Sequence, residues 1–285
     1  MKAPDFAYVK PASLDEALAL LSSHGGAAVP LAGGQSLMAT LNLRLSAPEL
    51  LVDLGGLDEL RGIAEDGVVI RIGALTTHGE VAQSPIVRRH LPLIAEAIRH
   101  VGHVAIRNRG TLGGSLAYAD PAAEMPACCA ALDAAIIIAG KSGRRTIAAG
   151  DFYKGLFATA LKDGELIVEV RVPKQKPKQF WGFAELARRH GDFALAGLAA
   201  AVETDGARIE NSRLVYFGCT DCARPALSVT QKLNGERLPL GSCEWLPDLL
   251  AVDLRPFDSP GLKARTKLQL AAVLTRRTLN TLRAV

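Results

Sequence analysis

One of the two most informative segments of the sequence is Arg107-Asn108-Arg109-Gly110-Thr111-Leu112-Gly113-Gly114-Ser115. Its Gly-Gly pair repeats the pattern of Leu31-Ala32-Gly33-Gly34-Gln35-Ser36, about eighty residues earlier. Each pair lies between predicted elements, the first after a strand and at the start of a helical segment. A glycine pair there lets the backbone approach a ligand with no Cβ in the way, and free amides at a helix start favour an anion. The two loops together predict a site that holds both phosphates of a diphosphate.

The same loops have a plainer interpretation, because a single Gly-Gly pair is most often only a tight turn. Neither loop has the G-x-G-x-x-G or G-x-x-x-x-G-K-[ST] pattern, so the sequence does not predict a Rossmann or Walker site. Ser36 and Ser115 add hydroxyl donors at equivalent offsets. The match between two separate loops is what favours an anion site.

The residues around the first loop predict alternating strands and helices. Ser13 and Glu16 have the spacing of a capping box before a helix that Gly25 and Gly26 end. A second capping box is predicted at 77–80. Further strands are expected at 28–32, 50–54, 68–72, 135–139, 145–148 and 166–172, and further helices at 36–44, 91–101 (closed by Gly102) and 122–131.

A polar, basic segment, Lys174-Gln175-Lys176-Pro177-Lys178, is the one linker-like stretch of the chain and predicts a domain boundary. We therefore expect one domain over residues 1–175 and a second over 176–285. Three strands are predicted in the second, at 181–188, 193–202 and 214–219, followed by helices around 245–250 and from Lys263 to the end. Strands followed by helices indicate an α+β fold.

Composition excludes several classes of protein. The chain has 285 residues, 49% of them apolar and 22% charged, which excludes intrinsic disorder. It has no apolar run of membrane-spanning length and no secretory signal at its N-terminus, so we expect no membrane span and a cytoplasmic location. The net charge of +4 comes from scattered basic pairs without interleaved aromatic residues, and no nucleic-acid partner is expected.

The cysteines and histidines do not form a recognisable metal site. Cys219 and Cys222 form one C-x-x-C, but no second such pair exists and no histidine follows His190. The histidines form no H-E-x-x-H set, and there is no G-x-S-x-G nucleophile motif. We expect no metal and no catalytic side chain in this chain, which suits a protein whose chemistry is that of a cofactor.

Four segments resemble one known family: Ala32–Ser36, Arg107–Ser115, Tyr118–Glu124 and Arg188–Ala194. They are similar to the flavin-binding medium subunits of the molybdenum hydroxylases, the group of xanthine dehydrogenase, carbon monoxide dehydrogenase and quinoline oxidoreductase. The length also matches such a subunit from end to end. The resemblance implies a two-part FAD-binding domain of the vanillyl-alcohol-oxidase (PCMH) type, followed by a smaller α+β domain with a three-stranded antiparallel sheet and helices.

The resemblance also implies a set of cofactor-binding residues. Residues 32–36 and 111–115 would hold the FAD diphosphate, Glu124 would hydrogen-bond FAD, and Phe193 would lie near the isoalloxazine ring. Without the resemblance, Val101, Ile167 and Phe193 would be assigned to the core, and Asp120 and Glu124 to a turn and a helix start. The full set is Ala32, Gly33, Gly34, Gln35, Ser36, Leu37, Val101, Thr111, Leu112, Gly113, Gly114, Ser115, Asp120, Glu124, Ile167 and Phe193.

The function that this resemblance implies is electron transfer. A large partner subunit would carry the molybdopterin-type molybdenum cofactor and a small one two [2Fe-2S] clusters, from which electrons reach FAD on this chain and then an external acceptor. A dimer of such heterotrimers is expected. Two alternatives stay open at this point: a self-contained FAD-dependent oxidase or reductase of the same fold, and a nucleotide-binding module without redox activity.

Overall fold

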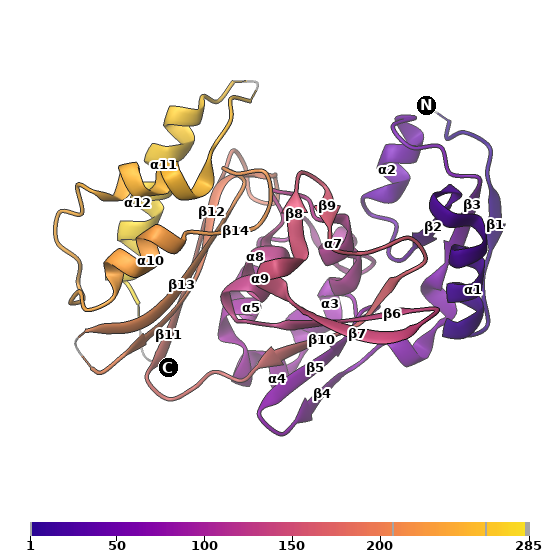
Figure 1. The fold of residues 1–285 in the computed structure, drawn as a ribbon, viewed down its shortest axis with the longest axis horizontal. Coiled ribbons are helices and arrows are strands. Elements are labelled where there is room, and N and C mark those ends of the chain that lie inside the picture. Colours follow the sequence, from indigo (N-terminus) through magenta and orange to yellow (C-terminus); the bar gives the residue numbers. More distant parts are fainter. Residues whose placement is uncertain (1, 207, 260, 283–285) are drawn as a thin grey trace.

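The protein has three bodies of secondary structure arranged along its longest axis, with the N-terminal body at one end and the C-terminal body at the other (Figure 1). The computed structural model describes residues 2–206, 208–259 and 261–282. None of the described helices is both long and apolar enough to cross a membrane.

The N-terminal body is a parallel three-stranded sheet in the order β1-β3-β2. Its strands are β1 (Ala7–Val9), β2 (Ala28–Leu31) and β3 (Leu50–Asp53), and its helices are α1 (Leu14–His24) and α2 (Leu37–Asn42). Helix α1 buries Leu14, Ala17, Leu18 and Leu21, the apolar face that helical spacing predicts. Only half of the first predicted capping box forms, because Glu16 Oε2 accepts from the Ala12 amide and not from that of Ser13.

The central body is an antiparallel sheet in the order β4-β5-β10-β6-β7. The strands are β4 (Ile63–Asp66), β5 (Val69–Gly73), β6 (Ala135–Gly140), β7 (Gly143–Ala148) and β10 (Leu166–Pro173), with a small ribbon of β8 (Tyr153–Gly155) and β9 (Ala158–Thr159). Its helices are α3 (His78–Gln83), α4 (Pro85–His90), α5 (Pro92–Ala97), α6 (Val104–Arg107), α7 (Leu112–Tyr118), α8 (Glu124–Ala131) and α9 (Ala149–Phe152).

Of two features predicted for the helices of this body, the capping box is confirmed and the length of one helix is wrong. The capping box at Thr77 and Glu80 forms completely. The helix predicted over 91–101 is wrong in length, because α5 ends at Ala97. The amides of Arg99 and His100 donate to carbonyls three residues back, so the chain tightens there into turns.

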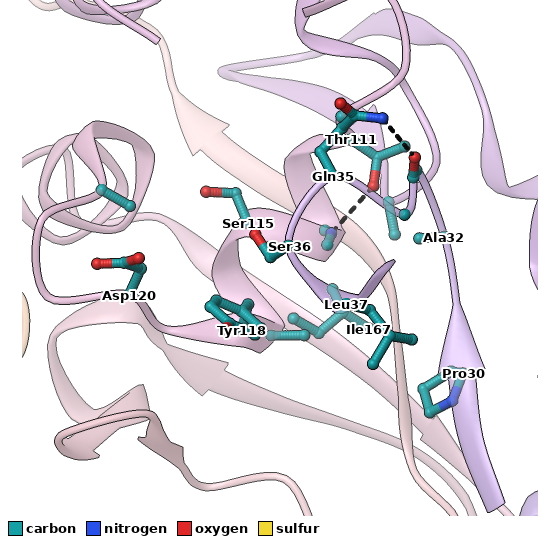
Figure 2. A pocket seen from close by; sticks show the side chains of 18 of the residues that line it. Pro30, Ala32, Gln35, Ser36, Leu37, Thr111, Ser115, Tyr118, Asp120 and Ile167 are labelled. Carbon is teal, nitrogen blue, oxygen red and sulfur yellow. Dashed lines mark hydrogen bonds between the residues drawn. The ribbon is translucent and has the colours of Figure 1, made fainter. Parts of the chain in front are cut away.

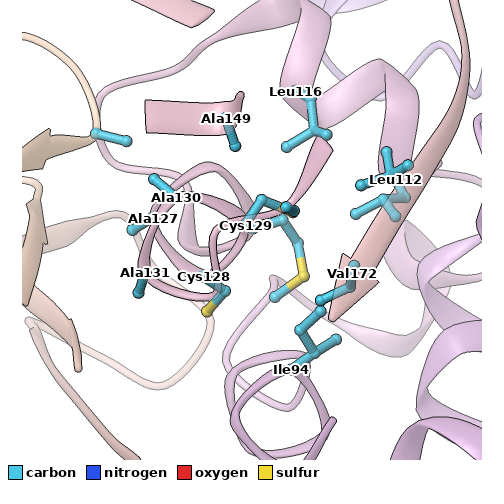
Figure 3. Close-up of a cluster of buried hydrophobic side chains, with 14 of the residues drawn as sticks. Ile94, Leu112, Leu116, Ala127, Cys128, Cys129, Ala130, Ala131, Ala149 and Val172 are labelled. Atoms are coloured by element: carbon cyan, nitrogen blue, oxygen red, sulfur yellow. The ribbon is translucent and has the colours of Figure 1, made fainter. Parts of the chain in front are cut away.

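Helix α8 forms the centre of the main core, since every one of its residues is buried. Figure 3 shows Cys128 and Cys129 among apolar side chains such as Ile94, Leu112 and Val172. Burial raises the pKa of the Cys129 thiol to about 12 and that of Cys219 to about 12. These cysteines are neutral core residues. Among the described residues, no three or more His, Cys, Asp or Glu side chains are grouped to hold a metal ion.

The C-terminal body is an antiparallel sheet of four strands, β11 (Gln179–Ala187), β12 (Ala194–Thr204), β13 (Ile209–Phe217) and β14 (Arg224–Pro225). The predicted three-stranded sheet is therefore wrong by one short edge strand. Strand β14 has two residues and includes a proline, which cannot donate to a neighbouring strand, so no periodic pattern marks it. Helices α10 (Leu227–Leu233), which was not predicted, α11 (Leu246–Leu254) and α12 (Ala264–Asn280) follow.

Both faces of this sheet are covered at β12, which explains why that strand is apolar along most of its length. On β12, Leu198 and Ala200 join the core formed with the C-terminal helices, whereas Ala199 joins the core of the central body. On β13, Tyr216 joins the core formed with the C-terminal helices, and Phe217 joins the core of the central body. The alternation fixes the C-terminal body against α8 and brings the turn between β11 and β12 to the edge of the central body.

Candidate cofactor site

A single long cavity of about 590 Å³ runs between the N-terminal and central bodies and reaches the turn between β11 and β12. Its volume is typical of a ligand site. Figure 2 shows Asp120 and Tyr118 toward one end of the site and Pro30 toward the other, with Ser36 beside Ser115 and with Ile167 between Leu37 and Pro30. The cavity lies where residues far apart in the sequence meet.

The first glycine loop presents a run of unpaired amides. Within the part of the chain that the structure describes, the backbone N–H groups of residues 33–37 donate to no protein acceptor. Gly34 has a φ of +73°, a value that glycine adopts without strain. Gln35 Nε2 donates to the Gly33 carbonyl oxygen at 3.2 Å, as Figure 2 shows. Such a loop is suited to an oxyanion.

The second glycine loop differs from the first, because most of its amides are already used. The Gly114 amide donates to Thr111 Oγ1 at 3.1 Å and the Gly113 amide to the Ala74 carbonyl at 2.8 Å. The amide of Leu112 donates to Thr76. The two loops therefore do not offer equivalent sets of free backbone amides. The second loop chiefly lets a ligand approach its backbone closely and provides the Ser115 hydroxyl as a donor.

Packing between backbones explains two of the glycines. A Cβ on Gly33 would lie 2.1 Å from the carbonyl oxygen of Arg109, and one on Gly113 would lie 2.5 Å from Ala74 Cβ. Glycine at these positions lets the first loop touch the second, and the second touch the end of β5. The sequence predicted glycine at these positions because the backbone must approach a ligand closely. The structure adds a second reason, which is that the backbone segments must also approach one another.

Acidic side chains also line the cavity. Glu124 at the start of α8 is 9% exposed, and its burial raises its pKa to about 8, with the charges of Glu185 and Asp120 adding to the effect. Burial also raises the pKa of Asp120, although its Oδ1 accepts from the Ala122 amide at 2.9 Å. At neutral pH Glu124 is mostly protonated and can donate a hydrogen bond.

The structure brings nearly all the predicted residues together. The cavity is lined by Ala32, Gly33, Gly34, Gln35, Ser36, Leu37, Val101, Thr111, Gly113, Gly114, Ser115, Asp120, Glu124, Ile167 and Phe193. Leu112 does not line it, since its side chain is fully buried in the main core on the opposite face of α7. Phe193 is 71% exposed and comes from the C-terminal body.

Sequence reasoning missed several lining residues. Tyr118 belongs to a segment that carried the resemblance, and its ring meets that of Phe157 edge-on at 5.2 Å. His78 lies directly after the Thr77 cap, and burial lowers its pKa to about 4. The segment 161–166 also lines the cavity. Only the position next to a cap could have indicated His78, since burial cannot be read from a single residue.

Comparison with known proteins identifies the family. A family model described as the FAD binding domain in molybdopterin dehydrogenase matches residues 4–175, and the CO dehydrogenase flavoprotein C-terminal domain matches residues 181–282. The chain belongs to the FAD-binding medium subunits of the molybdenum hydroxylases. The expected family is thus confirmed, and the protein is an oxidoreductase subunit.

Several relatives in this family match the chain over almost its whole length. The nicotine 6-hydroxylase medium subunit of Paenarthrobacter nicotinovorans is 37% identical over 98% of both chains. The caffeine dehydrogenase subunit beta of Pseudomonas sp. (strain CBB1) is 40% identical, covering 98% of this chain and 95% of that one. Carbon monoxide dehydrogenase from Hydrogenophaga pseudoflava, in a form lacking the Mo-pyranopterin moiety of its cofactor, superposes with a TM-score of 0.93 at 35% identity over 98% of both chains.

The residues of the cavity fit FAD. The five unpaired amides at 33–37 match a diphosphate, whose oxygens accept hydrogen bonds and carry negative charge. The mostly protonated Glu124 carboxyl can donate to a carbonyl oxygen or nitrogen of a flavin or to a ribityl hydroxyl. Val101, Ile167 and Phe193 supply apolar surface to cover an aromatic ring.

Proposed function

We propose that this chain holds FAD in the described cavity, with the diphosphate on the first glycine loop and the isoalloxazine ring toward Glu124 and Phe193. The fifteen lining residues of the predicted set would be the cofactor contacts. The observation that carries the proposal is the run of unpaired amides at 33–37 in a cavity that is also lined by the buried Glu124 carboxyl. The backbone of 33–37 would bind the phosphates, and the Ser115 hydroxyl would add a donor beside them.

We further propose that the chain passes electrons and does not itself transform an organic substrate. FAD, when bound, supplies the capacity to receive electrons and pass them to an external acceptor. The side chains described here would bind it, orient it and limit water around its ring. Support comes from relatives that are named as medium chains or subunits of dehydrogenases and hydroxylases.

The partners follow from the same proposal. A large subunit would carry the molybdenum cofactor and a small one two [2Fe-2S] clusters, and two such heterotrimers would pair. We also propose a cytoplasmic location, a PCMH-type fold for the first domain, and a boundary between residues 175 and 176. The ranges of the two family models, 4–175 and 181–282, support that boundary.

The test begins with the purified full-length chain. It should bind one FAD and show a flavin absorbance spectrum, and absence of binding with FAD in excess would overturn the assignment. Under anaerobic conditions, N-heterocycles and aldehydes should leave the bound flavin oxidised. Bleaching by any of them without partner subunits would instead support a self-contained oxidase or reductase, for which Asp120 and Glu124 would be candidate acid–base groups.

A further inference from the structure

The wall segment, residues 160–165, connects β9 to β10 and is held by an arginine that lies outside the cavity. Residues 161–165 line the cavity, whereas Arg145 on β7 does not. Arg145 Nε donates to Glu165 Oε1 at 2.7 Å, and Arg145 Nη2 donates to Glu165 Oε2 at 2.6 Å. Two parallel hydrogen bonds of this kind fix the orientation of a carboxylate as well as its distance.

Further hydrogen bonds extend this pair along the wall segment. Arg145 Nη2 also donates to the Ala160 carbonyl at 2.7 Å, and Glu165 Oε2 also accepts from the Lys162 amide at 2.8 Å. The Glu165 amide donates in turn to the Lys162 carbonyl at 3.1 Å. The two side chains therefore hold the backbone at the beginning, in the middle and at the end of the wall segment.

The sequence leaves room for this pair. Strand β6 lies between β7 and β10 in the sheet, so the pair connects β7 to the residue that directly precedes β10. Gly140 ends β6, and a Cβ on it would lie 3.1 Å from Glu165 Cγ, which is closer than side chains normally pack. Glycine at this position therefore lets the Glu165 side chain lie against β6 and reach Arg145.

The middle of the wall segment lies against the N-terminal body. Gly164 has a φ of +78°, and a Cβ on it would lie 3.2 Å from Ser22 Cα in α1. Ile167, which follows the wall segment on β10, lies next to Pro30 in Figure 2, toward the end of the site opposite Asp120. The wall segment therefore borders the Pro30 end of the cavity.

The Pro30 end is where the proposed orientation of the cofactor puts its adenosine half. In that orientation the diphosphate lies on the amides of 33–37 and the isoalloxazine ring points toward Glu124 and Phe193. The adenosine half then extends from the diphosphate in the other direction, because FAD joins its two halves through that diphosphate. The wall segment is thus a neighbour of the adenosine half and not of the ring.

We propose that Arg145 and Glu165 are a positioning pair, which holds the wall segment against α1 and thereby sets the affinity of the cavity for the adenosine half of FAD. This inference rests on the proposed function. The Arg145 side chain is 33% exposed and that of Glu165 is 13% exposed. An ion pair with this much exposure adds little to the stability of a whole domain, so its main effect is to keep the segment that it binds ordered.

The test compares ligand binding by the full-length chains of wild type, Arg145→Ala and Arg71→Ala. Arg71 on β5 donates to Glu169 on β10 through its Nε at 2.7 Å, so Arg71→Ala loses a similar pair from the same sheet. Neither Arg71 nor Glu169 lines the cavity, which makes this variant the matched control. Isothermal titration calorimetry gives the affinities for FAD and for ADP, which has the adenosine and the diphosphate but no flavin.

The loss should be confined to the adenosine half. In Arg145→Ala the affinities for FAD and ADP should both fall about tenfold, as expected when the wall segment keeps its binding position in only about one molecule in ten. The absorbance spectrum of bound FAD should not change, because the ring lies at the other end. Glu165→Ala should give a similar loss, and the double variant should lose no more than the larger single loss, since both substitutions remove the same contact.

Several results would overturn the positioning role while FAD binding stands. Wild-type affinity for FAD in Arg145→Ala is one, and an equal loss in Arg71→Ala is another, because it would show a general effect of losing an ion pair from the sheet. A loss for FAD without a loss for ADP, or an altered spectrum of bound FAD, would overturn the assignment to the adenosine half.

Failure of the wild-type chain to bind FAD would overturn the proposed function instead, and a measurement without any ligand then decides the positioning role. The Lys162 amide donates to Glu165, so its hydrogen–deuterium exchange in the apo chain should be faster in Arg145→Ala than in wild type. Arg71→Ala should exchange this amide at the wild-type rate. Exchange that is unchanged in Arg145→Ala would show that the pair does not hold the wall segment.

Discussion

Replacing Gly33 with alanine tests whether the two glycine loops must touch for the cofactor site to form. The new Cβ would lie 2.1 Å from the carbonyl oxygen of Arg109, whereas such contacts are essentially never closer than 3.0 Å. The loops must therefore separate by about 0.9 Å. The clashing atom belongs to the backbone, so no rotamer change relieves it.

Two effects should follow from this separation. Overpacking of this kind costs about 1–3 kcal/mol of folding free energy. Displacement of the amides at 33–37 should weaken at least one charge-assisted hydrogen bond to the diphosphate, worth about 1.5–3 kcal/mol, or roughly a tenfold to hundredfold loss of FAD affinity.

The assays are FAD titration by flavin fluorescence quenching and urea unfolding of the apo chain. Gly150→Ala is the matched control, because its Cβ meets nothing within 4 Å and Gly150 does not line the cavity. Wild-type affinity together with unchanged unfolding free energy in Gly33→Ala would refute the argument from loop contact.

Three further predictions follow from other parts of the site. In Glu124→Gln, the unfolding free energy of the apo chain should exceed that of the wild type by an amount that grows with pH. The increase should be up to about 1.4 kcal/mol per pH unit between roughly pH 5 and pH 8, because in that range the buried wild-type carboxyl is protonated in the folded state and ionised in the unfolded state. A difference in urea unfolding that stays constant with pH would contradict this. Leu112→Ala should cost about 2–5 kcal/mol, measured by urea unfolding, and leave the FAD affinity of the folded chain within a few fold, since the side chain lies in the core. Phe193→Ala should change the spectrum or affinity of bound flavin without lowering thermal stability by more than about 1–2 °C, since this ring is 71% exposed.

The sign of the Glu124 prediction follows from its raised pKa. Below the unfolded-state pKa near 4.5 both states are protonated and the carboxyl contributes nothing to the pH dependence. As pH rises toward 8, the unfolded state ionises freely while the folded state resists, so wild-type stability falls relative to the glutamine variant. Above about pH 8 both states are ionised and the difference becomes constant.

Local sequence determined the strands and helices that border the cavity. The repeated Gly-Gly pattern marked both loops, and the Thr77 and Glu80 spacing marked a helix start that the structure contains. These signals are local, because turns and caps depend on residues three or four apart. The short edge strand β14 left no such signal, since two residues carry no periodicity.

The tertiary structure determines which amides of those elements are free to bind a ligand and which side chains are buried in the core. The repeated pattern predicted equal roles for the two loops. In the fold, amides of the second loop donate hydrogen bonds to Ala74, Thr76 and Thr111, whereas those of 33–37 remain available to a ligand. The fold also buries the Leu112 side chain in the main core, although the pattern of the second loop had placed it among the cofactor contacts. Hydrogen-bond use and burial depend on neighbours that only folding brings together, and in this protein those two quantities decide which residues can bind a cofactor.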